Sequence, residues 1–147
     1  MHTGAGVPRH VHPRRVLTLR LPPEPASATR ARRVTRDHLA TVCPDDALDV
    51  ASLLVTELVS NAVVHARTDM LLVVDVVPGR IELRVQDGSP DDPERRELDP
   101  DAPSGRGLAI VEELATTWGV DRDRGQKVVW ASIDFPPAQK GAQRTVR

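Results

Sequence analysis

The feature that most constrains the fold is a pair of strand-like segments joined by Pro78-Gly79. Residues 70–77 are almost uniformly apolar, whereas residues 80–87 alternate apolar with polar side chains. Proline followed by glycine between two such segments predicts a β-hairpin turn. The alternation buries one face of the second strand and leaves the other to polar side chains. Because a lone hairpin is barely stable in water, the chain must supply further strands and helices that cover one face.

Helical and strand patterns on both sides of the hairpin supply these elements. An edge strand is expected at residues 15–21, where Pro22-Pro23 closes it. The further expected elements are helices over residues 27–41, 44–66 and 107–117 and strands over residues 118–120 and 127–135. These last two strands are expected to form a second hairpin across a charged turn that contains Gly125. This order predicts an α+β two-layer sandwich, with a mixed, largely antiparallel sheet covered on one face by helices.

The length fits one domain with one site. The chain has 147 residues, enough for a real core and too few for two ordinary domains. We expect the domain to span residues 15–135, between a disordered leader at 1–14 and a disordered tail at 136–147.

Charge and cysteine content exclude several classes of function. The formal net charge of -1 gives no basic field for nucleic acid or an anionic membrane, so we expect neither as a partner. Cys43 is the only cysteine, which excludes an intramolecular disulfide and a four-cysteine zinc site. The first residues contain no signal-peptide core, and the apolar run 70–77 is too short to span a bilayer. These features indicate a cytoplasmic protein.

The second predicted helix carries a polar stripe. Glu57, Asn61 and His65 follow one another at intervals of four, so they line one side of a helix that is otherwise rich in Leu, Val and Ala. An amide oxygen is a ligand for Mg²⁺, and a carboxylate can deprotonate a hydroxyl. An ordinary solvated face, or hydrogen bonding within the core, would explain the same pattern.

Two further segments have compositions that suit a nucleotide. Asp87 ends a predicted strand, and its carboxylate could accept a hydrogen bond from the exocyclic amine of adenine. Residues 104–108, Ser-Gly-Arg-Gly-Leu, lead into a helix whose free amides could hold phosphate. An ordinary Asp-Gly turn and a flexible loop with a helix cap remain the alternatives.

In order and spacing the three segments resemble a known superfamily. Residues 57–65 resemble the N box, residues 87–89 the G1 box and residues 104–108 the G2 box of the GHKL (Bergerat-fold) ATPases and kinases. The single-domain form is most similar to the anti-sigma-factor serine kinases of the SpoIIAB and RsbW type. The resemblance covers roughly residues 15–135.

The resemblance implies roles for individual residues. Asn61 matches the asparagine that coordinates Mg²⁺, Glu57 matches the proposed general base, and Asp87 matches the carboxylate that reads adenine. His65 matches the end of the N box, where a structural role is the alternative. Residues 88–104 match the ATP lid. The remaining nucleotide-binding positions are Ser89, Ser104, Gly105, Arg106, Gly107 and Leu108.

The resemblance implies an ATP- and Mg²⁺-dependent serine/threonine protein kinase that acts as an anti-sigma factor. Its expected substrate is a small anti-anti-sigma-type protein, a sigma factor is the second expected partner, and relatives often form homodimers. The chain departs from the usual pattern at Ser89-Pro90 and at Ser104, where many relatives have glycine. These departures keep open an alternative, a non-catalytic ATP-sensing module that binds a partner without phosphoryl transfer.

Overall fold

A computed structural model describes residues 14–65, 68–88 and 105–136 of the chain, with residues 105–108 described as backbone only. The elements are, in chain order, β1 (Arg15–Leu21), α1 (Ala26–Leu39), α2 (Asp45–His65), β2 (Met70–Val77), β3 (Arg80–Asp87), α4 (Gly105–Leu114), β4 (Thr117–Asp123) and β5 (Gln126–Asp134).

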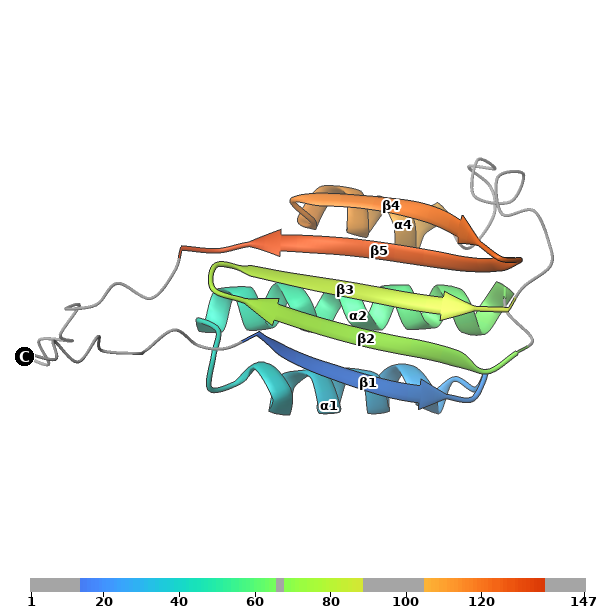
Figure 1. Ribbon diagram of the computed structural model, residues 1–147, viewed down its shortest axis with the longest axis horizontal. Coiled ribbons are helices and arrows are strands. Elements are labelled where there is room, and N and C mark those ends of the chain that lie inside the picture. The colour runs from blue at the N-terminus through green and yellow to red at the C-terminus, as the bar shows by residue number, and fades with distance from the viewer. Residues whose placement is uncertain (1–13, 66–67, 89–104, 137–147) are drawn as a thin grey trace, which may run out of the picture.

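The five strands form one open sheet in the order β1-β2-β3-β5-β4 (Figure 1). Every pair of neighbouring strands in it is antiparallel. The predicted fold class is therefore confirmed, and the sheet that was expected to be mixed is antiparallel throughout the described strands. The β2–β3 hairpin turns at Gly79, whose φ of 82° lies in the left-handed region that glycine occupies without strain.

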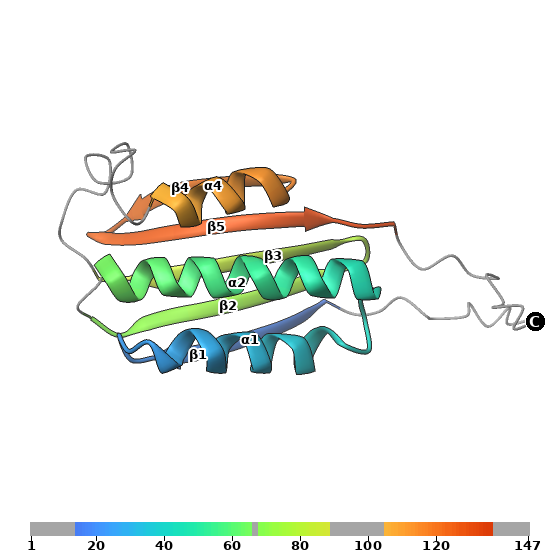
Figure 2. The ribbon, with the colours of Figure 1, turned by 180° about the vertical axis from the view of Figure 1, so that it is seen from behind.

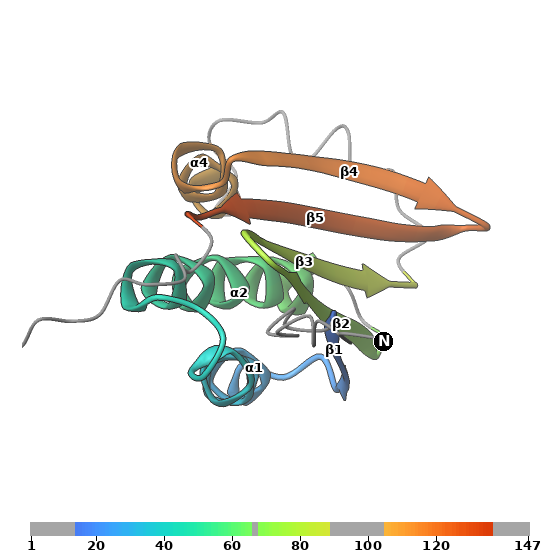
Figure 3. The same cartoon turned by 60° about the vertical axis from the view of Figure 1, so that its left-hand side comes forward.

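The helices lie together on one face of the sheet, so the domain has two layers (Figures 2 and 3). The long helix α2 lies in the middle of this layer, between α1 and α4, and packs against β3 and β5. Its first turn carries Asp45 and Asp46, whose negative charges are stabilised by the positive end of the helix dipole. The N–H of Leu48 donates to the carbonyl of Pro44 at 3.0 Å, so Pro44, which was predicted as the first helical residue, lies directly before the helix.

The core lies between α2 and the helix-facing side of the sheet. Leu54 and Leu58 of α2 and Leu83 of β3 are at most 1% exposed. Truncation of such a leucine to alanine costs about 2–5 kcal/mol, because the lost contacts leave a cavity. This core holds α2, and therefore its polar stripe, rigidly over the sheet.

The strand predictions for β1, β2 and β3 are confirmed with the same bounds, whereas the other elements differ at their ends. Helix α4 begins two residues earlier and ends three residues earlier than expected, and β4 extends to Thr117 and Asp123. The pairing of β4 with β5 explains this extension, since seven residues of β4 are in register with β5. The predicted hairpin between these two strands is confirmed, and only its length was underestimated.

One ion pair bears on the N-terminal boundary of the domain. Arg14, which we assigned to the leader, is ion-paired to Asp75 on β2 at 2.6 Å.

Helix α2 is long and apolar enough to cross a membrane by length and composition, but 56% of its apolar window is buried within the fold. The core helix of a globular domain has the same properties.

Candidate nucleotide-binding site

The polar stripe of α2 contains a buried oxygen that lacks a partner. Asn61 is 7% exposed, and its Oδ1 accepts no hydrogen bond from the described part of the chain. Leaving such a buried acceptor unsatisfied costs about 1–3 kcal/mol, which a ligand at this oxygen would recover. Glu57, one turn earlier, is half-buried. The geometry therefore favours a ligand site over the alternative of a side chain hydrogen-bonded within the core.

His65 is the third member of the polar stripe and the last residue of α2. It is half-buried and has an interaction partner. The ligand argument is made from Asn61, and the role of His65 at the end of the N box stays a prediction.

Asp87 ends β3 on the helix-facing side of the sheet. It is 3% exposed and continues the buried row formed by Leu83 and Val85. The next residue, Gly88, donates its N–H to Oγ1 of Thr68 at 3.1 Å, which fixes the backbone directly after the carboxylate. Of the predicted lid 88–104, Gly88 is described, and residues 89–104, which include Ser89 and Ser104, lie outside the described residues.

Lys127 was missed by sequence reasoning. It begins the buried row of β5, is 4% exposed, and lies opposite Asp87 in the β3–β5 register. The signal was present in the sequence, because Lys127 is in phase with Val129 and Ala131 and alternation places all three on one face. A carboxylate and an ammonium group therefore lie opposite each other at one end of the buried layer.

The Gly-rich segment forms the start of α4. Residues 105–108 are helical from Gly105 onward, and α4 packs against α2. The first N–H groups of a helix have no partner within the helix, and they favour anions. The start of α4 lies at the same end of the molecule as the ends of α2 and β3 and the start of β5 (Figure 1). The three predicted motifs therefore meet at one end of the two-layer sandwich.

This combination of fold and motifs agrees with a comparison of the sequence with known families. Residues 21–133 match the histidine kinase-like ATPase domain. The chain belongs to this family. The predicted histidine kinase-like ATPase family and its fold are confirmed, and such a domain implies ATP as the ligand.

A solved structure supports the fold assignment. The RsbU and RsbW domains of Rv1364c from Mycobacterium tuberculosis match with a TM-score of 0.63 and 19% sequence identity. The match covers 82% of this chain and 32% of that longer chain. No curated protein matches the sequence at a significant level.

The side-chain oxygen of Asn61 fits a magnesium–nucleotide complex as its ligand. Among the described residues, no three His, Cys, Asp or Glu side chains gather into a metal-binding group. The amide oxygen of Asn61 is a hard, neutral ligand, and Mg²⁺ commonly takes one or two protein ligands together with phosphate oxygens. The unsatisfied Oδ1 of Asn61 is thus suited to a cation that a nucleotide brings with it.

Two other features of the domain lie away from this site. An open groove of about 700 Å³ between α1 and α2 is lined by Arg32, Arg36 and Ser52 among others. Ser52 and Asn61 are nine residues apart, which puts them on opposite sides of α2 at about 100° per residue. Arg36 donates to Ser52 at 2.9 Å and pairs with Asp49, so it also joins the two helices.

The second feature is Cys43. Burial raises the pKa of its thiol to about 11, which keeps the thiol protonated at neutral pH.

Proposed function

We propose that this chain is an ATP-binding anti-sigma factor and serine/threonine protein kinase that phosphorylates a small anti-anti-sigma-type protein. The observation that carries this proposal is the buried Oδ1 of Asn61, which has no partner in the described residues and lies one turn from the half-buried Glu57. A cation ligand and a base on adjacent turns suit transfer of a phosphoryl group to a hydroxyl.

Each part of the site would bind a different part of the nucleotide. Asp87 would accept a hydrogen bond from the adenine amine, and Asn61 would hold Mg²⁺. The phosphates would lie against Gly105, Arg106, Gly107 and Leu108 at the start of α4, with Ser89 and Ser104 at the ends of the lid. When bound, Mg²⁺ neutralises the charge of the phosphate oxygens. His65 would support the end of α2 near the lid.

Glu57 is the proposed general base. Its carboxylate would accept the proton of a partner's Ser or Thr hydroxyl as that oxygen forms a bond to the γ-phosphorus of ATP. The bond from the γ-phosphorus to the bridging oxygen would break at the same time, and ADP would leave with that oxygen. The rest of catalysis would be positioning, because phosphoryl transfer requires little covalent chemistry from the protein.

The test combines nucleotide binding with transfer of a labelled phosphate. The protein is incubated with γ-labelled ATP, Mg²⁺ and a purified anti-anti-sigma-type protein encoded nearby. We expect label on a Ser or Thr of that partner, and we expect Glu57→Ala to abolish it while ATP still binds. Glu113→Ala is the matched control, since Glu113 is an exposed glutamate of α4. Full labelling by Glu57→Ala would contradict the assigned base.

The second candidate function is a non-catalytic ATP-sensing module. Ser89-Pro90 at the start of the lid favours it. Ser89 stands where the kinases usually have glycine, and the following Pro90 restricts the backbone. In that case ATP changes the affinity of the chain for its partner, and no partner is labelled. A pull-down with and without ATP separates this outcome from kinase activity.

The partner and location follow from the same proposal. A sigma factor would be the second partner, the protein would act in the cytoplasm, and a homodimer would agree with the relatives. The domain would occupy residues 15–135, and the ion pair with Asp75 would add Arg14 to it. Sedimentation of the purified protein with and without a sigma factor tests the assembly.

A further inference from the structure

We infer that Lys127 is a positioning residue that holds the Asp87 carboxylate in place for recognition of the nucleotide base. The inference rests on the proposed nucleotide site and deepens it, since it assigns a basis for selecting a purine with an exocyclic amine. It begins from the β3–β5 register, in which Asp87 lies directly opposite Lys127. Their exposed fractions are 3% and 4%, so both charged side chains lie within the fold.

The residues around Asp87 and Lys127 in the sheet show which charges lie next to the Asp87 carboxylate. Next to them on the same face, Val85 lies opposite Val129, and these two are also buried. On its other side Asp87 lies opposite Met70, which is 1% exposed and carries no charge. Lys127 therefore supplies the positive charge directly opposite Asp87 on the neighbouring strands. Arg122 of β4 lies opposite Lys127 in turn, and it is exposed.

Burial gives this arrangement its physical importance. A carboxylate or an ammonium group without a counter-charge is costly to bury, whereas a close pair offsets much of the desolvation. Directly opposite residues in an antiparallel ladder have Cβ atoms about 5 Å apart, within reach of a lysine side chain. The pairing would fix the direction of the carboxylate before nucleotide arrives.

The carboxylate still has capacity for a ligand. A carboxylate offers about four lone-pair positions, so one oxygen can face Lys127 while the other accepts from a base. Adenine presents an amine at position 6, whereas hypoxanthine and guanine present a carbonyl oxygen there. A carboxylate held by Lys127 would attract the amine and repel the carbonyl. Lys127 thereby contributes to base selection through Asp87.

The opposite face of the same strand ends provides a neutral comparison. There Gln86 donates to the side chain of Gln126, which is exposed. This pair joins the same two strands with amide groups on the open side of the sheet. Gln126→Met is thus a matched control for Lys127→Met, because both remove a polar group from the start of β5.

The test measures the affinities of the full chain for ATP and inosine triphosphate by calorimetry, with Mg²⁺ present. We expect Lys127→Met to weaken ATP binding about tenfold and to reduce the preference for ATP over inosine triphosphate. Lys127→Arg, which keeps the charge, should recover ATP affinity to within about threefold. Gln126→Met should bind both nucleotides as the wild type does. Wild-type affinity and preference in Lys127→Met would overturn the inference.

A double variant covers the case in which Lys127→Met fails to fold. Asp87→Asn with Lys127→Met replaces the charged pair by two neutral side chains, which removes the cost of a lone buried charge. Because Lys127 acts through Asp87, the double variant should bind ATP as Asp87→Asn alone does. A further loss beyond about threefold would contradict the inference, since Lys127 would then contact nucleotide independently. If the wild type itself fails to bind ATP, the proposed function fails before any variant is compared.

Discussion

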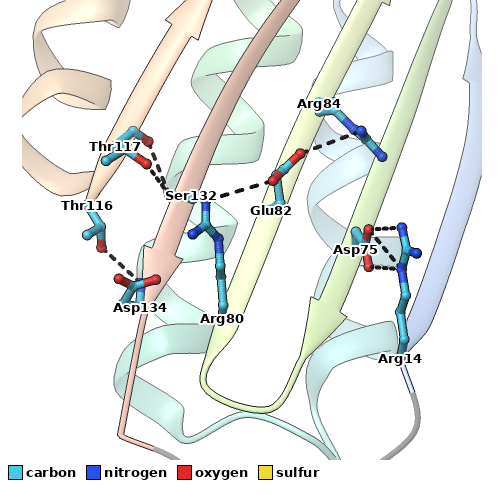
Figure 4. A network of polar contacts seen from close by, with 9 residues as sticks. All are labelled: Arg14, Asp75, Arg80, Glu82, Arg84, Thr116, Thr117, Ser132 and Asp134. Carbon is cyan, nitrogen blue, oxygen red and sulfur yellow. Dashed lines mark hydrogen bonds and ion pairs between the residues drawn. The ribbon is translucent and has the colours of Figure 1, made fainter.

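The two faces of the sheet handle polar side chains in opposite ways. On the open face, polar residues satisfy one another: Glu82 lies between Arg80 and Arg84, and Ser132 pairs with Thr117 (Figure 4). On the helix-facing side, apolar residues fill nearly every position, and polar groups gather at one end. There, Asn61 retains a buried oxygen without a partner in the described residues. The comparison supports our proposal that this end of the helix-facing side holds the ligand, whereas the open face supports the fold.

The largest expected effect comes from Asp87, at the helix-facing end. Asp87→Asn replaces one carboxylate oxygen by an amide that repels the adenine amine, and we expect ATP affinity to fall about a hundredfold. Calorimetric titration with ATP measures this. Asp121→Asn is the control, because Asp121 is an exposed aspartate of β4. Unchanged ATP affinity in Asp87→Asn would show that adenine binds elsewhere.

The next effect concerns the open face and stability rather than binding. A Cβ added at Gly119 would lie 2.8 Å from Cζ2 of Trp130, so the indole packs directly over the glycine backbone. We expect Gly119→Ala to lower the free energy of unfolding by about 1–3 kcal/mol, because the indole must shift. Denaturant unfolding measures the loss. Adding Trp130→Leu should reduce the penalty, and an equal penalty in both backgrounds would contradict the steric explanation.

A smaller effect is expected at Asn61, where the comparison between the two faces is sharpest. Asn61→Ala removes the unsatisfied oxygen, so we expect affinity for ATP in the presence of Mg²⁺ to fall about tenfold. Affinity measured in the presence of a chelator should change little. Ser60→Ala, which alters the half-buried neighbouring residue, is the control. An equal loss with and without Mg²⁺ would argue against a role of Asn61 in metal binding.

Much of the fold could be predicted because its signals are local. The hairpin at Pro78-Gly79 and the alternation of residues 80–87 determine β2 and β3, and the register shows the same bounds. The β4–β5 hairpin is local and was also predicted, whereas the pairing of β3 with β5 could not be predicted in this way, because it spans the segment that contains α4. The ends of β4 and α4 depend on the same tertiary contacts.

The candidate site shows a similar division. The stripe of Glu57 and Asn61 follows from helical spacing, but the unsatisfied Oδ1 depends on what packs around α2. Strand alternation alone places Lys127 on the buried face, but its position opposite Asp87 depends on the β3–β5 register, which the sequence does not show. Local patterns therefore located the polar residues, whereas the tertiary structure showed which of them are buried together.

The smallest expected effect concerns the ion pair between Arg14 and Asp75 on the open face. The hydrogen bond from Arg14 lowers the pKa of the Asp75 carboxyl, so the pair stabilises the fold above the carboxyl's unfolded pKa. That contribution is lost as pH falls through the lowered pKa of the folded state. Arg14→Ala should therefore lower the melting temperature at pH 7 by at most about 3 °C, since exposed pairs contribute little. The difference from wild type should shrink in acid as Asp75 becomes protonated. Arg20→Ala is the control, because Arg20 is another exposed arginine and lies opposite β2 in the sheet. A stability difference between Arg14→Ala and wild type that does not change with pH would show that packing, rather than charge, is responsible.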